Sequence, residues 1–185
     1  MYLPKHFEET RIEVLHELIG AYPFGTLRGH VARTNPVWRE TAPGAEALVI
    51  FQGPDTNSSS RWYPTKTETG KVVPTWTYVV VHAHGAPRFI DDRAWLRAFV
   101  ERLTNRHEAR RPEPWKVTDA PADYIDKQVG AIIGLEIPIA RLIGKWKVSQ
   151  NRLPQDRAGV VAGLLQEAPD SAAAIADWVR RIKSE

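Results

Sequence analysis

The sequence predicts an α+β protein in which a small antiparallel sheet or barrel carries peripheral helices. Short strand patterns punctuated by turns are interspersed with helical patterns, without the regular strand–helix alternation of a parallel sheet. The densest strand pattern lies in the middle of the chain, at residues 71–85. Two helical patterns, at residues 155–167 and 171–183, close the chain.

Length and composition indicate one globular domain. We expect a main domain at residues 1–152 and a helical extension at residues 153–185 packed on the same domain. The absence of cysteine excludes disulfides, thiolate metal sites and cysteine nucleophiles. A net charge of +3 gives little guidance about nucleic acid. Without a signal peptide or an apolar run that could span a bilayer, we expect a soluble, cytoplasmic protein.

The first third of the chain is predicted to contain both helices and strands. We expect a helix at residues 7–19, ended by Gly20, and then a turn at residues 22–25. A strand at residues 26–32 and a short helix over residues 37–39 follow. Next come a strand at residues 47–51, ended at residues 52–54, and a polar loop at residues 55–60. Alternation along the strand at residues 26–32 places Arg28 and His30 on its polar face. Asn35 can cap the short helix, whose first turn holds Pro36.

The central strand is predicted to have two different faces. Because side chains alternate along a strand, one face would hold Trp76, Tyr78, Val80, His82 and His84. The other face would hold the small residues Thr75, Thr77, Val79, Val81 and Ala83. This pattern suits a strand with one side in a core and the other lining a cleft or an interface. The alternative is a central strand whose His and Trp side chains are satisfied inside the fold.

Several further elements follow the central strand. A strand at residues 88–90 is expected to pair back on the central strand. A helix after Asp91 or Asp92, with a buried stripe from Trp95 to Leu103, leads into a solvated connection at residues 105–114. A helix at residues 122–131, a strand at residues 132–139 and the two final helices, separated by residues 168–170, complete the chain. Pro138 suggests that the strand at residues 132–139 lies at an edge or a bulge.

Motifs of common catalytic classes are missing from the sequence. It has no phosphate-binding loop, dinucleotide fingerprint, nucleophile elbow or H-E-x-x-H. His82 and His84 could share a metal, but nothing marks a third ligand, and we predict no metal site. The alanine-rich final helix, SAAAIADWVRR, is typical of a packing helix, which argues against direct reading of DNA by the C-terminal pair.

Basic, hydroxyl and aromatic residues gather at the predicted strand ends and adjoining loops. The polar members are Arg28, His30, Arg33, Asn35, Lys66, Lys145, Lys147 and Ser149, and the aromatic members are Trp62, Tyr63, Trp76 and Trp146. A phosphate group needs a cation for charge and hydroxyl or N–H donors for direction. A flat ring system with a phosphate tail would suit the combination, whereas the simpler alternative is a set of solvated strand ends.

Three motifs in this order are specific: G-H-V-A-R-x-N-P at residues 29–36, G-K-V-V-P-T-W at residues 70–76 and G-K-W-K-x-S-Q-N at residues 144–151. Together with ALVIFQGP, WYPTK and GLEIPI, they make nearly the whole chain resemble the PaiB family of FMN-binding negative transcriptional regulators. The resemblance implies a split antiparallel β-barrel related to pyridoxamine phosphate oxidases. It also implies a homodimer with FMN in a cleft between the subunits.

The resemblance also implies which residues bind the cofactor. They are Arg28, His30, Arg33, Asn35, Lys66, Thr75, Trp76, Lys147, Ser149 and Gln150. Among them, we expect Arg33 and Lys66 to supply charge for the phosphate, and Thr75 and Trp76 to lie beside the ring. Catalytic residues are not assigned, and direct contact with DNA has no recognisable reading motif.

Two departures from the family pattern keep alternatives open. The segment at residues 21–25 leads straight into Thr26, where family members have a longer stretch with additional strands, so the first hairpin is shortened. In addition, the polar stretch DTNSSSRWY replaces a more apolar entry to the W-Y-P motif. The alternatives are a flavin-dependent oxidoreductase that uses His82 and His84 for proton transfer, and a truncated relative that keeps the barrel but no longer binds flavin.

Overall fold

The computed structural model describes residues 3–19, 26–167 and 171–182. The chain forms two compact units, which are described in turn. The first comprises Met1–Pro23, Val49–Ala83 and Arg141–Glu185, and the second comprises Phe24–Leu48 and His84–Ala140. The helices at the C-terminus therefore belong to the first unit, and the division at residue 152 stays a prediction.

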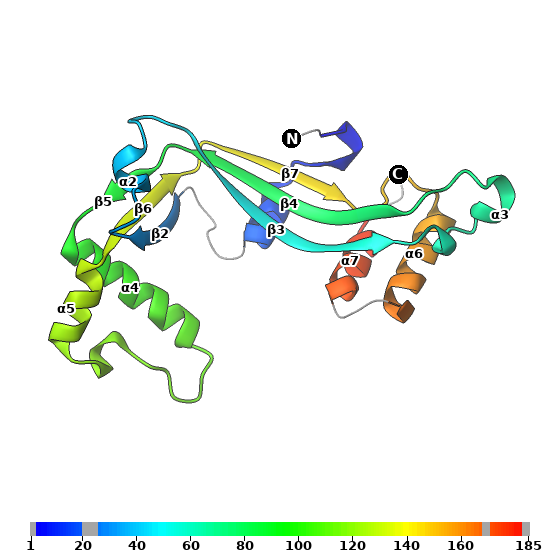
Figure 1. The fold of residues 1–185 in the computed structure, drawn as a ribbon. Coiled ribbons are helices and arrows are strands. Elements are labelled where there is room, and N and C mark those ends of the chain that lie inside the picture. Colours follow the sequence, from blue (N-terminus) through cyan, green and yellow to red (C-terminus); the bar gives the residue numbers. More distant parts are fainter. Residues whose placement is uncertain (1–2, 20–25, 168–170, 183–185) are drawn as a thin grey trace. The chain divides into compact units, whose positions relative to one another are not determined.

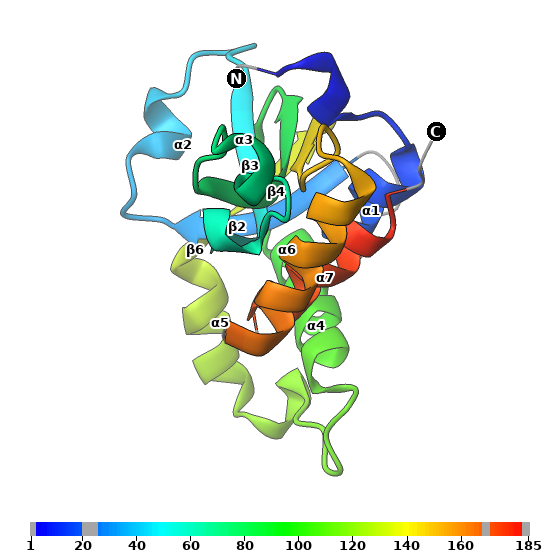
Figure 2. The same ribbon diagram turned by 90° about the vertical axis from the view of Figure 1, so that its right-hand side faces the viewer.

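The first unit is built on a four-stranded sheet of order β1-β7-β4-β3 (Figure 1). Its strands are β1 (Glu8–Glu9), β3 (Ala47–Ser58), β4 (Thr75–Gly85) and β7 (Arg141–Lys147), and its helices are η1 (Lys5–Phe7), α1 (Ile12–Ile19), η2 (Ser60–Trp62), α3 (Lys66–Thr69), α6 (Pro154–Glu167) and α7 (Ser171–Arg180). Figures 1 and 2 show α6 and α7 side by side on one side of β3 and β4. The sheet thus has one side covered by helices.

The core of the first unit forms against one face of β4. Thr77, Val79, Val81 and Ala83 have no exposed surface. The Thr77 hydroxyl is satisfied there by the Ser58 hydroxyl of β3, 2.7 Å away. On the other face Trp76 is exposed and Tyr78 is half-buried. The predicted separation of β4 into a core face and a more open face is confirmed.

The second unit holds a three-stranded antiparallel sheet of order β2-β6-β5. Its strands are β2 (Thr26–Ala32), β5 (Arg88–Ile90) and β6 (Ile132–Pro138), and its helices are α2 (Val37–Glu40), α4 (Arg93–Glu108), η3 (Val117–Asp119) and α5 (Ala122–Gly130). Leu96 of α4, Val117 of η3, and Ile125 and Val129 of α5 form its hydrophobic core. Gly134 of β6 admits the ring of Trp95, because a side chain at that position would overlap the indole.

Three predictions about elements are wrong. The first helix starts at Ile12 and not at residue 7, because Glu8 and Glu9 pair with Lys145 and Gly144 of β7. β3 continues to Ser58 through the segment predicted to be a loop. It can do so because an edge strand tolerates proline and because Ser58 gains a buried hydrogen-bond partner.

The third error concerns β5, which pairs with β6 and not with the central strand. Arg88, Phe89 and Ile90 lie opposite Glu136, Leu135 and Gly134. Local sequence does not distinguish these two partners, since both strands present apolar residues to a neighbour. β6 is consequently the middle strand of its sheet, and Pro138 is its last residue.

Other predicted elements are confirmed. β2 spans residues 26–32 as predicted. α4 follows Asp92, whose side chain accepts a hydrogen bond from the Trp95 backbone N–H. Asn35 Oδ1 accepts a hydrogen bond from the Val37 N–H at the start of α2. The predicted end of the first helix at Gly20, the turn at residues 22–25, the shortened hairpin at residues 21–25 and the separator at residues 168–170 lie outside the described residues.

Two glycines on α6 allow the helix to approach η2 closely. A Cβ on Gly159 would overlap the carbonyl oxygen of Trp62, and a Cβ on Gly163 would overlap the indole ring of the same residue. We therefore expect Gly159→Ala to lower the free energy of unfolding by about 1–3 kcal/mol, the usual cost of overpacking, as measured by chemical denaturation. Gly29→Ala is the control, because a Cβ at Gly29 meets nothing within 4 Å. Equal stability of the two variants would contradict the close approach.

Candidate functional site

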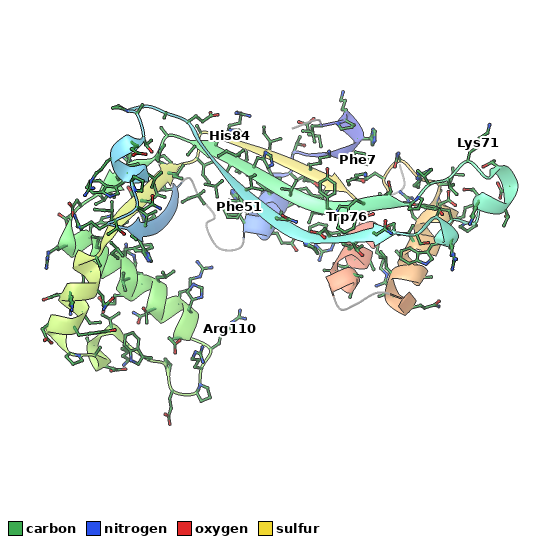
Figure 3. All side chains as sticks on the ribbon, viewed as in Figure 1. Phe7, Phe51, Lys71, Trp76, His84 and Arg110 are labelled. Atoms are coloured by element: carbon green, nitrogen blue, oxygen red, sulfur yellow. The ribbon has the colours of Figure 1, made fainter. Side chains whose placement is uncertain are left out.

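Two lysines of β7 lie over an aromatic ring of β4. Lys145 Nζ is 5.3 Å and Lys147 Nζ is 6.0 Å from the centroid of the Tyr78 ring. Trp76, two residues before Tyr78 on the same strand face, keeps 54% of its surface exposed. We call Trp76, Tyr78, Lys145 and Lys147 the lysine–aromatic face. Figure 3 labels Trp76 on the part of β4 toward α3, away from His84.

The alternation of β7 explains why these lysines share one face. Gly144 and Trp146 point to the helix-covered side, where Gly144 lies against Leu15 of α1. Trp146 packs edge-on against Trp178 of α7, with 5.5 Å between the ring centroids. Because the side chains at residues 145 and 147 must then point to the opposite side, burial of Trp146 directs both ammonium groups toward β4. Cations near an aromatic face attract flat, negatively charged ligands.

The turn after β7 is held by its own side chains. Gln150 Oε1 accepts a hydrogen bond from the Val148 N–H at 2.9 Å, and Gln150 Nε2 donates to the Trp146 carbonyl oxygen. The Arg152 N–H donates to the Ser149 carbonyl oxygen. Ser149 has a φ of +70°, which is strained for a residue with a Cβ. Gln150 therefore shapes the turn that presents Ser149.

Hydroxyl and indole groups from two sequence motifs are buried near this turn. Of the residues described by the structure, Trp62 and Trp146 each have a buried indole N–H without a hydrogen-bond partner, and the Tyr63 and Ser149 hydroxyls are buried beside each other. Burial raises the pKa of the Tyr63 phenol, while the nearby Arg152 charge opposes the rise. Unpaired buried polar groups are costly. They mark this part of the first unit as a place where water or a ligand group would be stabilising.

The WYPTK segment contributes one exposed cation. The Thr65 N–H and hydroxyl both donate to the buried Asp156 carboxylate at the start of α6, which fixes the segment. Lys66 follows as the first residue of α3 and is exposed. Thr75, at the start of β4, lies on the opposite strand face from Trp76. The exposed Lys66 side chain is consequently available to an anion. Because Thr75 and Trp76 point to opposite sides of the sheet, they cannot both lie against one face of a ligand ring, as the sequence predicted.

In the second unit, Arg33 is paired within the protein. Its guanidinium donates to both oxygens of Asp91, to the Gly130 carbonyl oxygen at 2.7 Å and to the Ile132 carbonyl oxygen at 3.4 Å. Arg33 holds the pKa of the Asp91 carboxyl below its usual range, and Asp91 raises the pKa of Arg33. Four of its five N–H donors are used in this way. Arg33 links the end of β2 to α5 and to the segment before α4, and a role in phosphate binding stays a prediction.

The other three candidates in this unit lie along β2 and the start of α2. Arg28 Nε donates to Glu136 Oε1 of β6 at 2.7 Å. The His30 ring lies edge-on to Phe99 of α4, with centroids 6.0 Å apart. Asn35 caps α2 through its side-chain oxygen. Arg28 and His30 share the sheet face that carries α4, and Asn35 has a structural role.

The ten predicted cofactor-binding residues thus fall in two units. The second unit contains Arg28, His30, Arg33 and Asn35, and the first contains Lys66, Thr75, Trp76, Lys147, Ser149 and Gln150. Within the first unit, Trp76 and Lys147 both border Tyr78. The assignment of all ten to one cofactor stays a prediction. Tyr78 and Lys145 are not among the ten, although the sequence had placed Tyr78 on the strand face of Trp76 and had grouped Lys145 with the other basic residues.

Among the described residues there is neither a metal-binding cluster nor a membrane-spanning helix. His84 Nδ1 lies 3.0 Å from Glu46 Oε1. In residues 3–19, 26–167 and 171–182 there is no group of three or more His, Cys, Asp or Glu side chains that could hold a metal ion. None of the helices in these ranges has the length and apolar character needed to cross a bilayer.

The sequence matches a known family and several known proteins. Residues 25–141 match the family described as "Putative FMN-binding domain". An uncharacterized protein of Emericella nidulans is 34% identical over 87% of this chain and 74% of its own length. The protease synthase and sporulation protein PAI 2 of Bacillus subtilis is 26% identical over 96% of this chain and 95% of its own length. These matches confirm the resemblance found in the motifs.

Comparison with solved structures supports the fold class. The flavocytochrome Anf3 of Azotobacter vinelandii superposes with a TM-score of 0.50 at 13% identity, over 78% of this chain and 72% of its own length. A FAD- and heme-binding protein of Mycobacterium smegmatis gives a TM-score of 0.47 at 18% identity, and this chain spans 54% of its length. The superposition with Anf3 confirms the predicted α+β split-barrel class.

The Arg33–Asp91 pair makes a prediction about pH. Because the folded protein depresses the pKa of Asp91, the pair contributes stability above the unfolded pKa of the carboxyl and loses it as the pH falls through the folded value. Arg33→Gln should raise the pKa of Asp91 toward its ordinary value, as measured by carbon-detected NMR titration of the carboxyl. Arg97→Gln, which removes a different exposed ion pair, with Asp126, should leave Asp91 unchanged. An unchanged Asp91 titration in Arg33→Gln would contradict the pairing.

Proposed function

The chain belongs to the PaiB-like family of FMN-binding domains, and on that premise we propose that it is a cytoplasmic, homodimeric FMN-binding protein that acts as a negative transcriptional regulator. FMN is the cofactor of this family. The homodimer, the regulatory role and the use of this chain's own residues toward FMN are the parts of the proposal that go beyond family membership.

The lysine–aromatic face is the observation that carries the cofactor assignment. Trp76 offers an exposed indole, on which a flat isoalloxazine ring can stack, with Tyr78 beside it on the same strand. Lys145 and Lys147 add positive charge within 6.0 Å of the Tyr78 ring centre. FMN carries a ring of this kind and a negatively charged phosphate, so the donor set fits the group. Bound FMN would supply reversible electron and hydride transfer.

An exposed strand supports the homodimer. β3 is the edge strand of its sheet and is twelve residues long. Ile50 on this strand keeps 56% of its surface exposed, and Trp76 on the neighbouring strand keeps 54%, so both strands carry large exposed apolar side chains. Long edge strands with exposed apolar side chains are covered in stable proteins, because they otherwise associate without control. A second copy of the chain is the partner that the family resemblance implies.

The regulatory role follows from the family resemblance. A regulator that binds promoter DNA would give a mobility shift that weakens as salt rises. A flavin-dependent oxidoreductase would instead turn over a reduced nicotinamide when loaded with FMN. The two outcomes separate the regulator from the alternative enzyme.

The cofactor assignment predicts the effect of removing the Trp76 ring. Wild-type protein titrated with FMN should bind it with a rise in melting temperature, because a ligand of the native state stabilises that state. Trp76→Ala should weaken FMN binding about tenfold, which corresponds to ~1.4 kcal/mol, the scale of one aromatic stacking contact. Isothermal titration calorimetry measures both affinities. Trp115→Ala is the matched control, because Trp115 is similarly exposed, at 45%, but lies in the second unit.

The cofactor assignment fails in two ways that calorimetry can distinguish. If wild-type protein shows no heat and no thermal shift with FMN, the chain is a relative that has lost the ligand. If Trp76→Ala and Trp115→Ala both bind FMN as tightly as wild-type protein does, FMN binds away from the lysine–aromatic face.

A further inference from the structure

A carboxylate on the middle strand of the second unit's sheet is flanked by two arginines. In the register of this sheet Glu136 of β6 lies directly opposite Arg28 of β2 on one side and Arg88 of β5 on the other. Glu136 Oε1 accepts from Arg28 Nε at 2.7 Å, and Glu136 Oε2 accepts from Arg88 Nη2 at 3.2 Å. We call Arg28, Glu136 and Arg88 the arginine clamp.

The burial of the three side chains is unequal. The Glu136 side chain is only 10% exposed, whereas those of Arg28 and Arg88 are 45% and 65% exposed. A buried ion pair is weak evidence for stabilisation, because desolvation offsets much of the attraction. The inner carboxylate does, however, fix the positions of two exposed guanidinium groups that would otherwise move freely on long side chains.

The clamp carries surplus positive charge and surplus donors. Two guanidinium groups share one carboxylate, so the net charge of the three side chains is +1. Each arginine has five N–H donors, and each uses one on Glu136. Planar forks with unused N–H groups match the oxygens of a phosphate ester, which accepts several charge-assisted hydrogen bonds at once.

We propose that the arginine clamp is a binding site for a phosphate group, in which Arg28 and Arg88 contact the phosphate and Glu136 is a positioning residue. Arg88 and Glu136 are not among the residues that the sequence motifs assigned to the cofactor. The ligand is a phosphorylated small molecule, and the chemical group that the clamp recognises is the phosphate itself.

The test measures binding of three probes: FMN, riboflavin, which lacks the phosphate, and inorganic pyrophosphate. Calorimetry gives the affinities for wild-type protein, Arg88→Gln and Glu136→Gln, with circular dichroism to check folding. Arg97→Gln is the control, because Arg97 belongs to an exposed ion pair with Asp126 in the same unit. Arg88→Gln should weaken pyrophosphate binding at least tenfold and leave riboflavin binding unchanged. If FMN uses this site, its affinity should fall with that for pyrophosphate.

Glu136→Gln separates positioning from simple charge. Removing this carboxylate makes the site more positive, so charge alone predicts tighter pyrophosphate binding. Loss of positioning predicts weaker binding in spite of the added charge, and this is the result we expect. Tighter binding would overturn the role of Glu136.

The outcomes for the clamp and for the FMN proposal are distinguishable. Pyrophosphate binding that Arg88→Gln abolishes, in a protein that does not bind FMN, would support the clamp and end the cofactor proposal. Suppose instead that FMN binding depends on Trp76 and is unchanged in Arg88→Gln, and that pyrophosphate does not bind. This result would overturn the clamp and leave the cofactor proposal standing. A phosphate probe that binds the wild type and Arg88→Gln equally also overturns the clamp.

Discussion

The alternation of side chains along β4 is the constraint on which the rest of the account depends. One face of this strand, from Thr77 to Ala83, is completely buried, and a one-residue shift in register would place these side chains on the open side. Because that face is fixed, Trp76 and Tyr78 must point the other way. The same logic on β7, where Trp146 is anchored by Trp178, sends Lys145 and Lys147 to the side of Tyr78, where Lys145 is buried and Lys147 is partly exposed. Packing on one side of the sheet therefore creates the candidate site on the other.

Elements governed by local patterns could be predicted from the sequence. The two faces of β4, the extent of β2 and the Asn35 cap of α2 all follow from residue periodicity and short-range hydrogen bonding. Elements decided by distant partners could not. β3 runs through a polar stretch because the Ser58 hydroxyl meets Thr77, and β1 forms because Glu8 and Glu9 lie beside β7. No local signal distinguishes these segments from a loop or a helix end.

The candidate site shows the same division. The sequence pattern drew attention to Trp76, Tyr78, Lys145 and Lys147, and the geometry shows that both ammonium groups lie over the Tyr78 ring. Motif matching could not show that most of the Arg33 donors are used on Asp91 and backbone carbonyl groups, or that Gln150 is engaged with the backbone of its own turn. These pairings depend on the tertiary neighbours of each side chain. Ser149 was found by its motif, but its left-handed backbone and buried hydroxyl are properties of the fold.

The most direct test of the central claim is fluorine NMR of protein labelled with fluorotryptophan at its seven tryptophans, with the Trp76 resonance assigned from Trp76→Phe. A flavin ring stacked on Trp76 shifts the resonance of that residue through its ring current, whereas an exposed tryptophan elsewhere is unaffected. On addition of FMN, the account predicts the largest shift at Trp76 and none at Trp115. An unmoved Trp76 resonance at saturating FMN would contradict it.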